Sequence, residues 1–296
     1  MPQNGGAMSQ ARLVDVAGTK LFVEQRGDAE GFPLIALHGG PGLDHHMFGD
    51  YLDPLVADGH HRLLLVDQRG QGRSDRDSDP ETWTLAQMVA DVTDLAESLG
   101  LSSYAVLGHS FGAFVALQHA VDFPGAARGT VVSAGVASAR WLDGVENALA
   151  SFEPLSLRER VAESWSREAS VQTEAEVAEL MHDQMPFHFA DPLDPRLEEY
   201  AARTADARYA PDVLRRFAVA SYGGMEVEDR LASIGQPLLV LSGRYDRTCT
   251  AEAGSDMATR VPGAEFAVFE ESAHMAFVEE PGGFLSAVNE FLERLI

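Results

Sequence analysis

Residues 104–120 read YAVLGHSFGAFVALQHA, and this stretch decides the fold. A short apolar run is followed at once by the pattern G-x-S-x-G at 108–112 and then by a small, apolar segment of helical character. In this context the pattern predicts a strand that turns sharply into a helix, and its glycines remove Cβ clashes that would forbid the turn. Such a turn exposes the Ser110 hydroxyl and points the helix dipole at it.

The rest of the chain alternates short apolar runs with segments of helical periodicity. Apolar or β-branched runs predict strands at 12–17, 20–26, 33–39, 62–68, 104–110, 130–135, 237–243 and 265–270. Apolar residues at helical spacing predict helices at 84–99, 111–123, 251–260 and 281–295. Gly18-Thr19 has the composition of a two-residue hairpin turn between the first two strands. The alternation indicates an α/β fold with a mostly parallel central sheet flanked by helices.

Residues 138–230 differ in character from the sequence on either side of them. Strand-like runs vanish, and Arg and Glu accompany an almost purely helical pattern that prolines divide into short helices. We interpret this stretch as a helical cap inserted after the sixth strand. Strand signals resume beyond it, so we expect 12–137 and 231–296 to form one α/β core, preceded by a flexible N-terminal tail over 1–11.

Charge and composition exclude several classes of protein. The 296 residues carry 46 Asp and Glu against 22 Lys and Arg, a formal net charge of -24, which opposes binding to nucleic acid and to anionic membranes. No run approaches the ~18 apolar residues that a membrane helix needs, and the N-terminus lacks the features of a signal peptide. Lys20 is the single lysine, so a Schiff-base lysine elsewhere is excluded. We expect a cytoplasmic protein.

A serine hydroxyl is a weak nucleophile that needs a base and an orienting acid. In sheets of this type these groups come from later strand ends, the acid first and the histidine second. Asp246 follows the run PLLVLSG, and His274 lies just beyond the run EFAVFE. Both fall at the carboxyl ends of strands, the edge where open α/β sheets bind ligands. We predict that His274 takes the Ser110 proton and that Asp246 orients the ring and stabilises its cation.

The oxyanion formed in such a reaction needs preorganised hydrogen-bond donors. The Phe111 N–H at the start of the helix is one candidate. HGGPG at 38–42 follows another strand, and because its glycines let the backbone approach a substrate closely, we assign the Gly40 N–H as the second donor. This chemistry requires no cofactor and no metal.

Other reactive side chains carry weaker signals. His45-His46 and His60-His61 lack the carboxylate spacing of metallohydrolases, and we interpret both pairs as loop residues. Cys249, the single cysteine, excludes an internal disulfide and a Cys-rich metal site. It lacks the sharp turn of a nucleophile, so we interpret it as a small buried apolar residue.

Taken together, these motifs resemble those of the α/β-hydrolases with a helical cap, and most of all the proline iminopeptidase family of serine aminopeptidases. The matching pieces are HGGPG (38–42), DQRGQGRS (67–74), GHSFG (108–112), GRYD (243–246) and His274 followed by EEP (279–281). The likeness extends over about residues 12–295 apart from the cap. It implies the α/β-hydrolase fold, an acyl-enzyme and the release of an N-terminal residue from a small-molecule or short-peptide substrate.

The cap departs from that family and leaves the substrate open. In the family, glutamates of the cap, and in some members the residue after the catalytic acid, bind the free amine of the substrate. Here Arg247 follows the acid. Glu226 and Glu228 are candidate cap ligands, but the acidic cap favours an ordinary solvent-exposed role for each glutamate taken singly. Arginine at this position also suits carboxylesterases, lactonases and C–C bond hydrolases of carboxylated substrates, and a ligand receptor on the same scaffold is a further alternative. The sequence does not indicate an oligomeric state.

Overall fold

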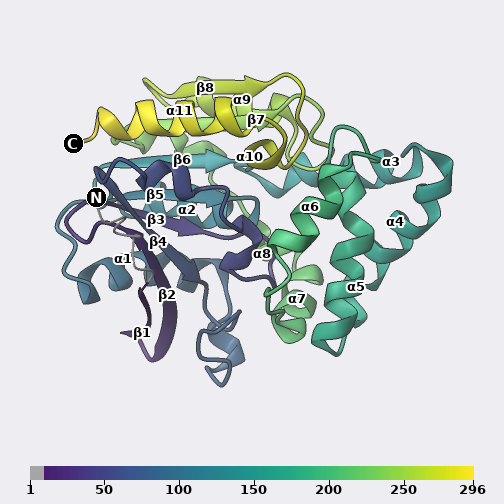
Figure 1. Cartoon of the computed structure of the whole chain (residues 1–296), viewed down its shortest axis with the longest axis horizontal. Coiled ribbons are helices and arrows are strands. Elements are labelled where there is room, and N and C mark those ends of the chain that lie inside the picture. Colours follow the sequence, from purple (N-terminus) through teal and green to yellow (C-terminus); the bar gives the residue numbers. More distant parts are fainter. Residues whose placement is uncertain (1–9) are drawn as a thin grey trace, which may run out of the picture.

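The computed structural model describes residues 10–296, whose eight strands form one sheet in the order β1-β2-β4-β3-β5-β6-β7-β8 (Figure 1). The strands are β1 (Gln10–Val16), β2 (Thr19–Gly27), β3 (Phe32–Leu37), β4 (His61–Asp67), β5 (Ala105–His109), β6 (Gly129–Ser133), β7 (Leu238–Gly243) and β8 (Glu265–Phe269). β1 and β2 pair antiparallel, as do β2 and β4, and the other pairs are parallel. The mostly parallel sheet is the predicted one.

The beginning of the sheet differs from the prediction in two details. β1 already includes residues 10 and 11, which the sequence places in the tail, and the rest of that predicted tail lies outside the described residues. Val16 pairs with Thr19, so the hairpin turns at Ala17 and Gly18, one residue earlier than predicted. Both turn residues have positive φ, 20° and 77°, the backbone hand that matches the twist of a two-residue hairpin.

Helices cover both faces of the sheet because its central strands are buried on both sides. α1 (Leu85–Ser98), α2 (Phe111–Asp122) and α9 (Ala251–Arg260) pack on one face, and α10 (Ala276–Glu279) and α11 (Pro281–Glu293) pack on the other. Successive residues of one strand reach opposite faces, as Val106 and Leu107 do. Burial on both sides explains why the strand sequences are continuously apolar.

The stretch between β6 and β7 is helical, as predicted. We call residues 138–230 the cap segment. Its α-helices are α3 (Val145–Ala150), α4 (Leu155–Arg167), α5 (Glu174–Gln184), α6 (Arg196–Arg203), α7 (Pro211–Ala218) and α8 (Ser221–Gly224). Figure 1 shows α3 to α6 gathered at one end of the sheet. Two small apolar clusters lie within the cap segment, one joining Val177 of α5 to Leu214 of α7 and one around Phe152, Val161 and Phe187.

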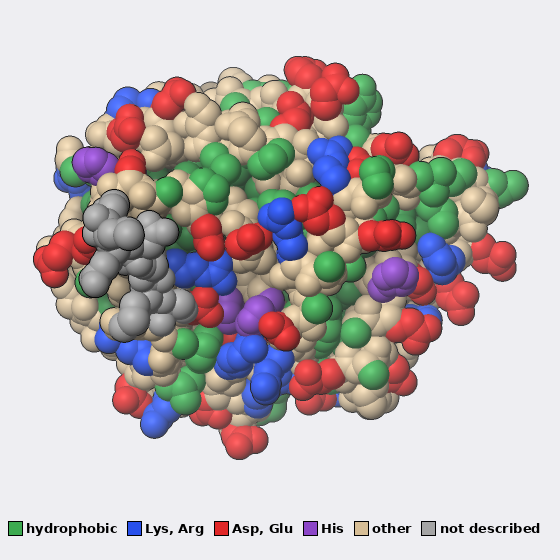
Figure 2. Space-filling model, viewed as in Figure 1, with side chains coloured by type: hydrophobic (Ala, Val, Ile, Leu, Met, Phe, Trp, Pro, Cys, Tyr) green, Lys and Arg blue, Asp and Glu red, His purple; other side chains and the backbone are tan. Residues whose placement is uncertain are grey.

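The negative charge is spread over the molecule. Figure 2 shows acidic side chains over both the core and the cap segment on the face in view, with arginines interspersed among them. Surface arginines of the protein form ion pairs with these acids, such as Arg203 with Asp50 and Arg294 with Glu265. Within residues 10–296, no helix has the length and apolar character that a membrane span requires.

Candidate active site

Ser110 lies in the sharp turn that the sequence predicts between β5 and α2. Its backbone has φ 55° and ψ -119°, a conformation that is strained for a residue with a side chain. A Cβ on Gly108 would lie 2.1 Å from the Gly112 carbonyl oxygen, and one on Gly112 would lie 2.2 Å from the Leu37 carbonyl oxygen. The glycines are therefore required because the turn packs against itself and against β3.

Asp246 and His274 meet at the same edge of the sheet, beyond β7 and β8. His274 Nδ1 lies 2.8 Å from Asp246 Oδ2, and both side chains are buried. Asp246 Oδ1 accepts hydrogen bonds from the backbone N–H groups of Thr248 and Cys249 and from the Thr248 hydroxyl. Burial alone would raise the pKa of Asp246, but His274 and the bonds from Thr248 lower it below its ordinary value. Asp246 is therefore held as a carboxylate that orients the imidazole.

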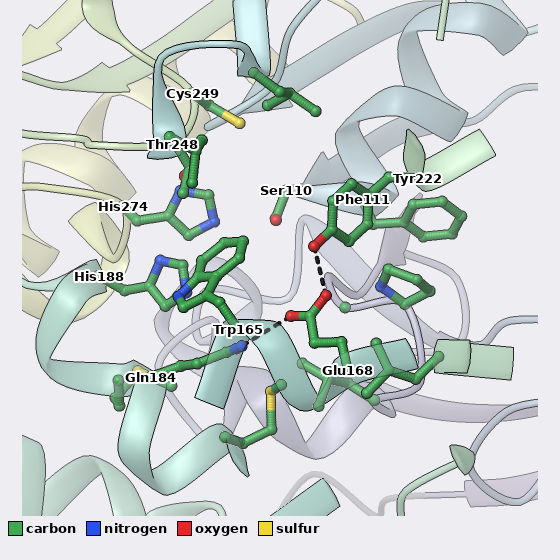
Figure 3. A pocket seen from close by; sticks show the side chains of 18 of the residues that line it. Ser110, Phe111, Trp165, Glu168, Gln184, His188, Tyr222, Thr248, Cys249 and His274 are labelled. Atoms are coloured by element: carbon green, nitrogen blue, oxygen red, sulfur yellow. Dashed lines mark hydrogen bonds between the residues drawn. The ribbon is translucent and has the colours of Figure 1, made fainter. Parts of the chain in front are cut away.

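Ser110 and His274 line a common cavity of about 630 Å³, which is the size of a small-molecule site. Figure 3 shows the Ser110 hydroxyl and the His274 ring facing each other across this space. The cavity lies between the carboxyl ends of the strands and the cap segment, which contributes residues of α3, α4 and α5 to its wall. The structure thus places the three predicted residues at one edge of the cavity, with a hydrogen bond between His274 and Asp246 and none, within residues 10–296, between His274 and the Ser110 hydroxyl.

The two predicted oxyanion donors also line this cavity. The HGGPG loop lies directly against the serine, since a Cβ on Gly39 would come within 3.0 Å of Ser110 Cβ. Gly40 has φ 115°, which favours glycine, and Phe111 begins α2. No backbone hydrogen bond of the turns, loops and caps in residues 10–296 uses the N–H of Gly40 or Phe111. Both donors are free for a ligand.

A buried carboxylate on the cavity wall is missing from the predictions made on the sequence. Glu168, at the end of α4, is 5% exposed and accepts hydrogen bonds from Tyr222 Oη (2.5 Å) and Gln184 Nε2 (2.8 Å) (Figure 3). Burial raises the pKa of Glu168, and the described residues include no Arg, Lys or His paired with it. Tyr222 lies in a left-handed turn with φ 51°. The sequence did contain a pattern that could have predicted the burial of Glu168. This residue lies seven positions, about two helical turns, after the buried Val161 and so continues the same face of the helix.

The two cap glutamates named from the sequence lie elsewhere. Glu226 accepts a hydrogen bond from the Ser138 hydroxyl, and Glu228 pairs with Arg140 and with the Trp141 indole N–H. Neither glutamate lines the cavity. Of the two roles that the sequence left open for them, the structure therefore does not support contact with a substrate in this cavity.

The Arg247 side chain binds other groups of the protein and does not line the cavity. Its guanidinium donates to the backbone carbonyls of Phe187, Phe189 and Ala190 and stacks over the rings of Phe152 and Phe187. The arginine after Asp246 therefore fastens the cap segment to the loop after β7. It gives no support to a carboxylated substrate.

In the part of the chain that the structure describes, two clusters bring three possible metal ligands within 4.8 Å of one another: Asp44, His45 and His46, and Asp246, Cys249 and His274. His45 lies in a buried 3-10 helix and bonds Asp67, so its interpretation as a plain loop residue is wrong. In the second cluster Asp246 and His274 bond each other. Cys249 is buried as predicted, and burial raises the pKa of its thiol, which keeps it neutral.

Comparisons with known proteins agree with this architecture. A model of the alpha/beta hydrolase fold family matches residues 33–281. A proline iminopeptidase from Heyndrickxia coagulans is 28% identical over 292 residues, which cover 96% of this chain and 98% of the relative. The structure of proline iminopeptidase from Mycobacterium smegmatis has a TM-score of 0.75 at 23% identity and covers 97% of this chain and 98% of its own. An esterase from Exiguobacterium antarcticum has a TM-score of 0.73 at 21% identity and covers 96% and 100%.

Proposed function

The chain belongs to the alpha/beta hydrolase fold family, and from this premise we propose that it is a serine hydrolase that releases an N-terminal residue from a short peptide or a similar aminoacyl compound. The fold family and the similarity to proline iminopeptidases together identify the protein as a hydrolase. The finer proposal depends on the buried carboxylate of Glu168 in the wall of the cavity that contains Ser110.

Ser110 is the proposed nucleophile. His274 takes the proton from Ser110 Oγ as this oxygen bonds to the substrate carbonyl carbon, and the oxyanion accepts hydrogen bonds from the Gly40 and Phe111 N–H groups. His274 then gives the proton to the leaving nitrogen as the C–N bond breaks, which leaves an ester on Ser110. Water gives a proton to His274 and attacks the ester carbon, and the C–O bond to Ser110 breaks as Oγ regains a proton.

Asp246 supports both steps by its bond to His274 Nδ1. This bond keeps the hydrogen of the neutral ring on Nδ1 and turns Nε2 toward the serine, and the carboxylate stabilises the imidazolium while it carries the proton. The hydrogen bonds that Asp246 accepts from Thr248 and Cys249 fix the carboxylate in turn.

Glu168 is the proposed site for the substrate amine. Its two hydrogen-bond partners, Tyr222 and Gln184, are both uncharged, so its negative charge lacks a compensating cation in the described structure. A buried carboxylate is stabilised by a positive charge nearby. The protonated amine of an N-terminal residue supplies that charge, which would orient the substrate so that its first carbonyl carbon reaches Ser110.

We also propose a division of labour between the two parts of the chain. The core, residues 12–137 and 231–296, would carry Ser110, Asp246, His274 and both oxyanion donors. The cap segment would roof the cavity and choose the substrate through Glu168. Changes in the cap segment should therefore alter selectivity, whereas changes at the sheet edge should alter the chemical step.

The test compares prolyl 2-naphthylamide with its N-acetylprolyl counterpart, which differs in the charge on the amine. We expect Glu168→Gln to lower kcat/KM for the prolyl substrate by ~10-fold to 100-fold, the effect of one hydrogen bond to a charged group, and to change the acetylated one little. Glu226→Gln, a cap glutamate outside the cavity, is the matched control. Equal losses on both substrates would contradict the role of Glu168.

The serine mechanism is tested separately by Ser110→Ala. Loss of the nucleophile should cost at least ~10³-fold in kcat while the protein stays folded, as measured by circular dichroism. A fluorophosphonate should label the wild type at Ser110 and leave the variant unlabelled. A Ser110→Ala variant that keeps most of its activity would disprove the assignment.

An esterase is the second candidate, and a specific observation favours it. Apart from the buried Glu168 and the exposed Glu146, the cap side of the cavity has a largely apolar wall that includes Leu142, Val145, Leu149 and Ala162. Such a wall accepts the acyl or alkyl part of an uncharged ester. Short-chain 2-naphthyl esters assayed beside the prolyl substrates would identify this activity, and Glu168→Gln should leave it unchanged or improve it.

A further inference from the structure

His188 is a cavity residue that the proposed mechanism does not use. It ends the short 3-10 helix Met185–His188 of the cap segment, and its ring centroid lies 4.8 Å from that of His274. Figure 3 shows the two rings side by side, on the His274 side of the cavity. The His188 Nδ1 atom is buried without a hydrogen-bond partner in the described structure.

The surroundings of His188 decide which of its nitrogens can bind a ligand. Burial lowers the pKa of His188 to about 3, assisted by the positive charge that His274 carries when protonated. The ring is therefore neutral at ordinary pH, with one N–H and one lone pair. A buried N–H without an acceptor is less tolerated than a buried lone pair. We therefore place the hydrogen on Nε2, because Nδ1 is buried without a partner and the His188 side chain lines the cavity.

The backbone around His188 is fixed by contacts with the loops that carry Asp246 and His274. The His274 N–H donates to the His188 carbonyl at 3.0 Å. Arg247 donates to the carbonyls of Phe187 and Phe189 on either side. The Glu279 carboxylate accepts from the N–H of Ala190 and from that of Ala273, which precedes His274. These bonds preorganise the His188 side chain beside His274 before any ligand arrives.

The position of His188 relative to Glu168 indicates which end of a substrate it meets. Figure 3 places Glu168 with Tyr222 and Phe111 on one side of Ser110, and His188 with His274 on the other. The amine end would bind Glu168. Because His274 protonates the leaving nitrogen, the leaving group must lie against the His274 ring, where His188 is its neighbour.

We propose that the His188 Nε2–H donates a hydrogen bond to the carbonyl oxygen of the residue that leaves, so that the enzyme favours peptide leaving groups over arylamines. This inference rests on the proposed aminopeptidase function. It assigns His188 to leaving-group selectivity, a role separate from that of the proton-transferring His274. A site built to bond a substrate group discriminates against analogues that lack it.

The test compares prolyl-glycinamide, whose leaving group has a carbonyl oxygen, with prolyl 2-naphthylamide, whose leaving group has none. His188→Phe keeps a ring against His274 but removes the donor, and His188→Gln keeps a donor. We expect His188→Phe to lower kcat/KM for the glycinamide by ~3-fold to 10-fold more than for the naphthylamide, the effect of one neutral hydrogen bond. His188→Gln should recover part of that difference. His182→Phe, at an exposed position on α5, is the matched control.

Each outcome has a distinct meaning. Equal losses on both substrates in His188→Phe would assign His188 a packing role and overturn the inference, while the aminopeptidase function would stand. The inference would also be overturned if His188→Gln behaved like His188→Phe in the ratio of the two substrates. If the wild type cleaved neither prolyl compound, the proposed function would be wrong and the inference would fall with it.

Discussion

Two buried pairs of histidine and aspartate lie at the carboxyl edge of the sheet in the described residues, and we propose that one of them, His274 with Asp246, serves catalysis. Asp67 ends β4 and Asp246 follows β7, so both carboxylates are positioned by a strand. Each accepts a hydrogen bond from the Nδ1 atom of a histidine, at 2.5 Å from His45 and at 2.8 Å from His274. By burial and by this bond alone, the two pairs are nearly alike.

The difference lies at the second ring nitrogen. His45 Nε2 lies 3.3 Å from a carboxylate oxygen of Glu24, so its ring is held between two negative charges. Burial would lower the pKa of His45, but the bonds to Asp67 and Glu24 raise it to about 9. The His45 ring is therefore held as a cation at neutral pH, and both of its nitrogens are paired with carboxylates, so neither is available to exchange a proton with a substrate.

His274 has neutral neighbours in place of the second carboxylate. The rings of His109 and His188 lie 5.0 Å and 4.8 Å from its own, and burial lowers the pKa of both. Its Nε2 edge faces the cavity and Ser110. Within residues 10–296 no second carboxylate pairs with the His274 ring, which leaves Nε2 available for the proposed reaction. The comparison teaches that the partner of Nε2 decides whether such a pair stabilises the fold or serves catalysis.

The largest expected effect separates the two histidines by activity. His274→Gln should lower kcat/KM by at least ~10³-fold to 10⁴-fold, about 4–5.5 kcal/mol in the transition state, because the general base is lost. The same substitution at His45 should leave the activity of the folded protein within ~3-fold, because the His45 ring does not touch the reacting atoms. The measurement is the rate on prolyl 2-naphthylamide or an aryl ester at low temperature.

The second expected effect separates the two aspartates by stability. Asp67→Asn leaves the His45 cation with less compensation in a buried site, and breaking a buried ion pair costs roughly 3–5 kcal/mol. Urea unfolding should show this loss. Asp53→Asn, at a half-exposed partner of Arg26, is the control and should cost less than ~1 kcal/mol. If Asp67→Asn were as mild as Asp53→Asn, the interpretation of the His45 pair as structural would be wrong.

Much of this architecture follows from local sequence. Central strands buried on both faces must be continuously apolar, so their positions could be predicted from runs such as LLVLSG. Gly108 and Gly112 mark the serine turn because no side chain fits there. Once the strands are known, Gly40, Asp246 and His274 must lie near Ser110, because parallel strand ends share one edge.

The remainder depends on packing between segments that are distant in sequence. Glu168 reaches the cavity only because α4 packs beside α5 and a left-handed turn brings Tyr222 to its carboxylate. The hydrogen-bond partners of Arg247 are backbone carbonyls. Because every residue has a carbonyl, the sequence does not indicate which ones Arg247 binds. Glu24 meets His45 across the sheet edge, 21 residues along the chain. The order of motifs therefore predicted the pair of Asp246 and His274, but the bonds that hold His45 between Asp67 and Glu24 could not be predicted from residue types.

The smallest expected effect is a pH dependence confined to the structural pair. His45 has its pKa raised from the ordinary 6.5 to about 9, so its contribution is fully present below pH 6.5 and is lost as the pH rises through about 9. At 1.36 kcal/mol per pKa unit this amounts to about 3 kcal/mol at most.

The unfolding free energy of the wild type minus that of His45→Gln should therefore decrease between pH 6.5 and 9.5. The same difference taken for His182→Gln, at an exposed site, should stay flat. A difference for His45→Gln that did not change with pH would mean that the ring is neutral in the folded protein, and the contrast with His274 would then lie in geometry and not in charge.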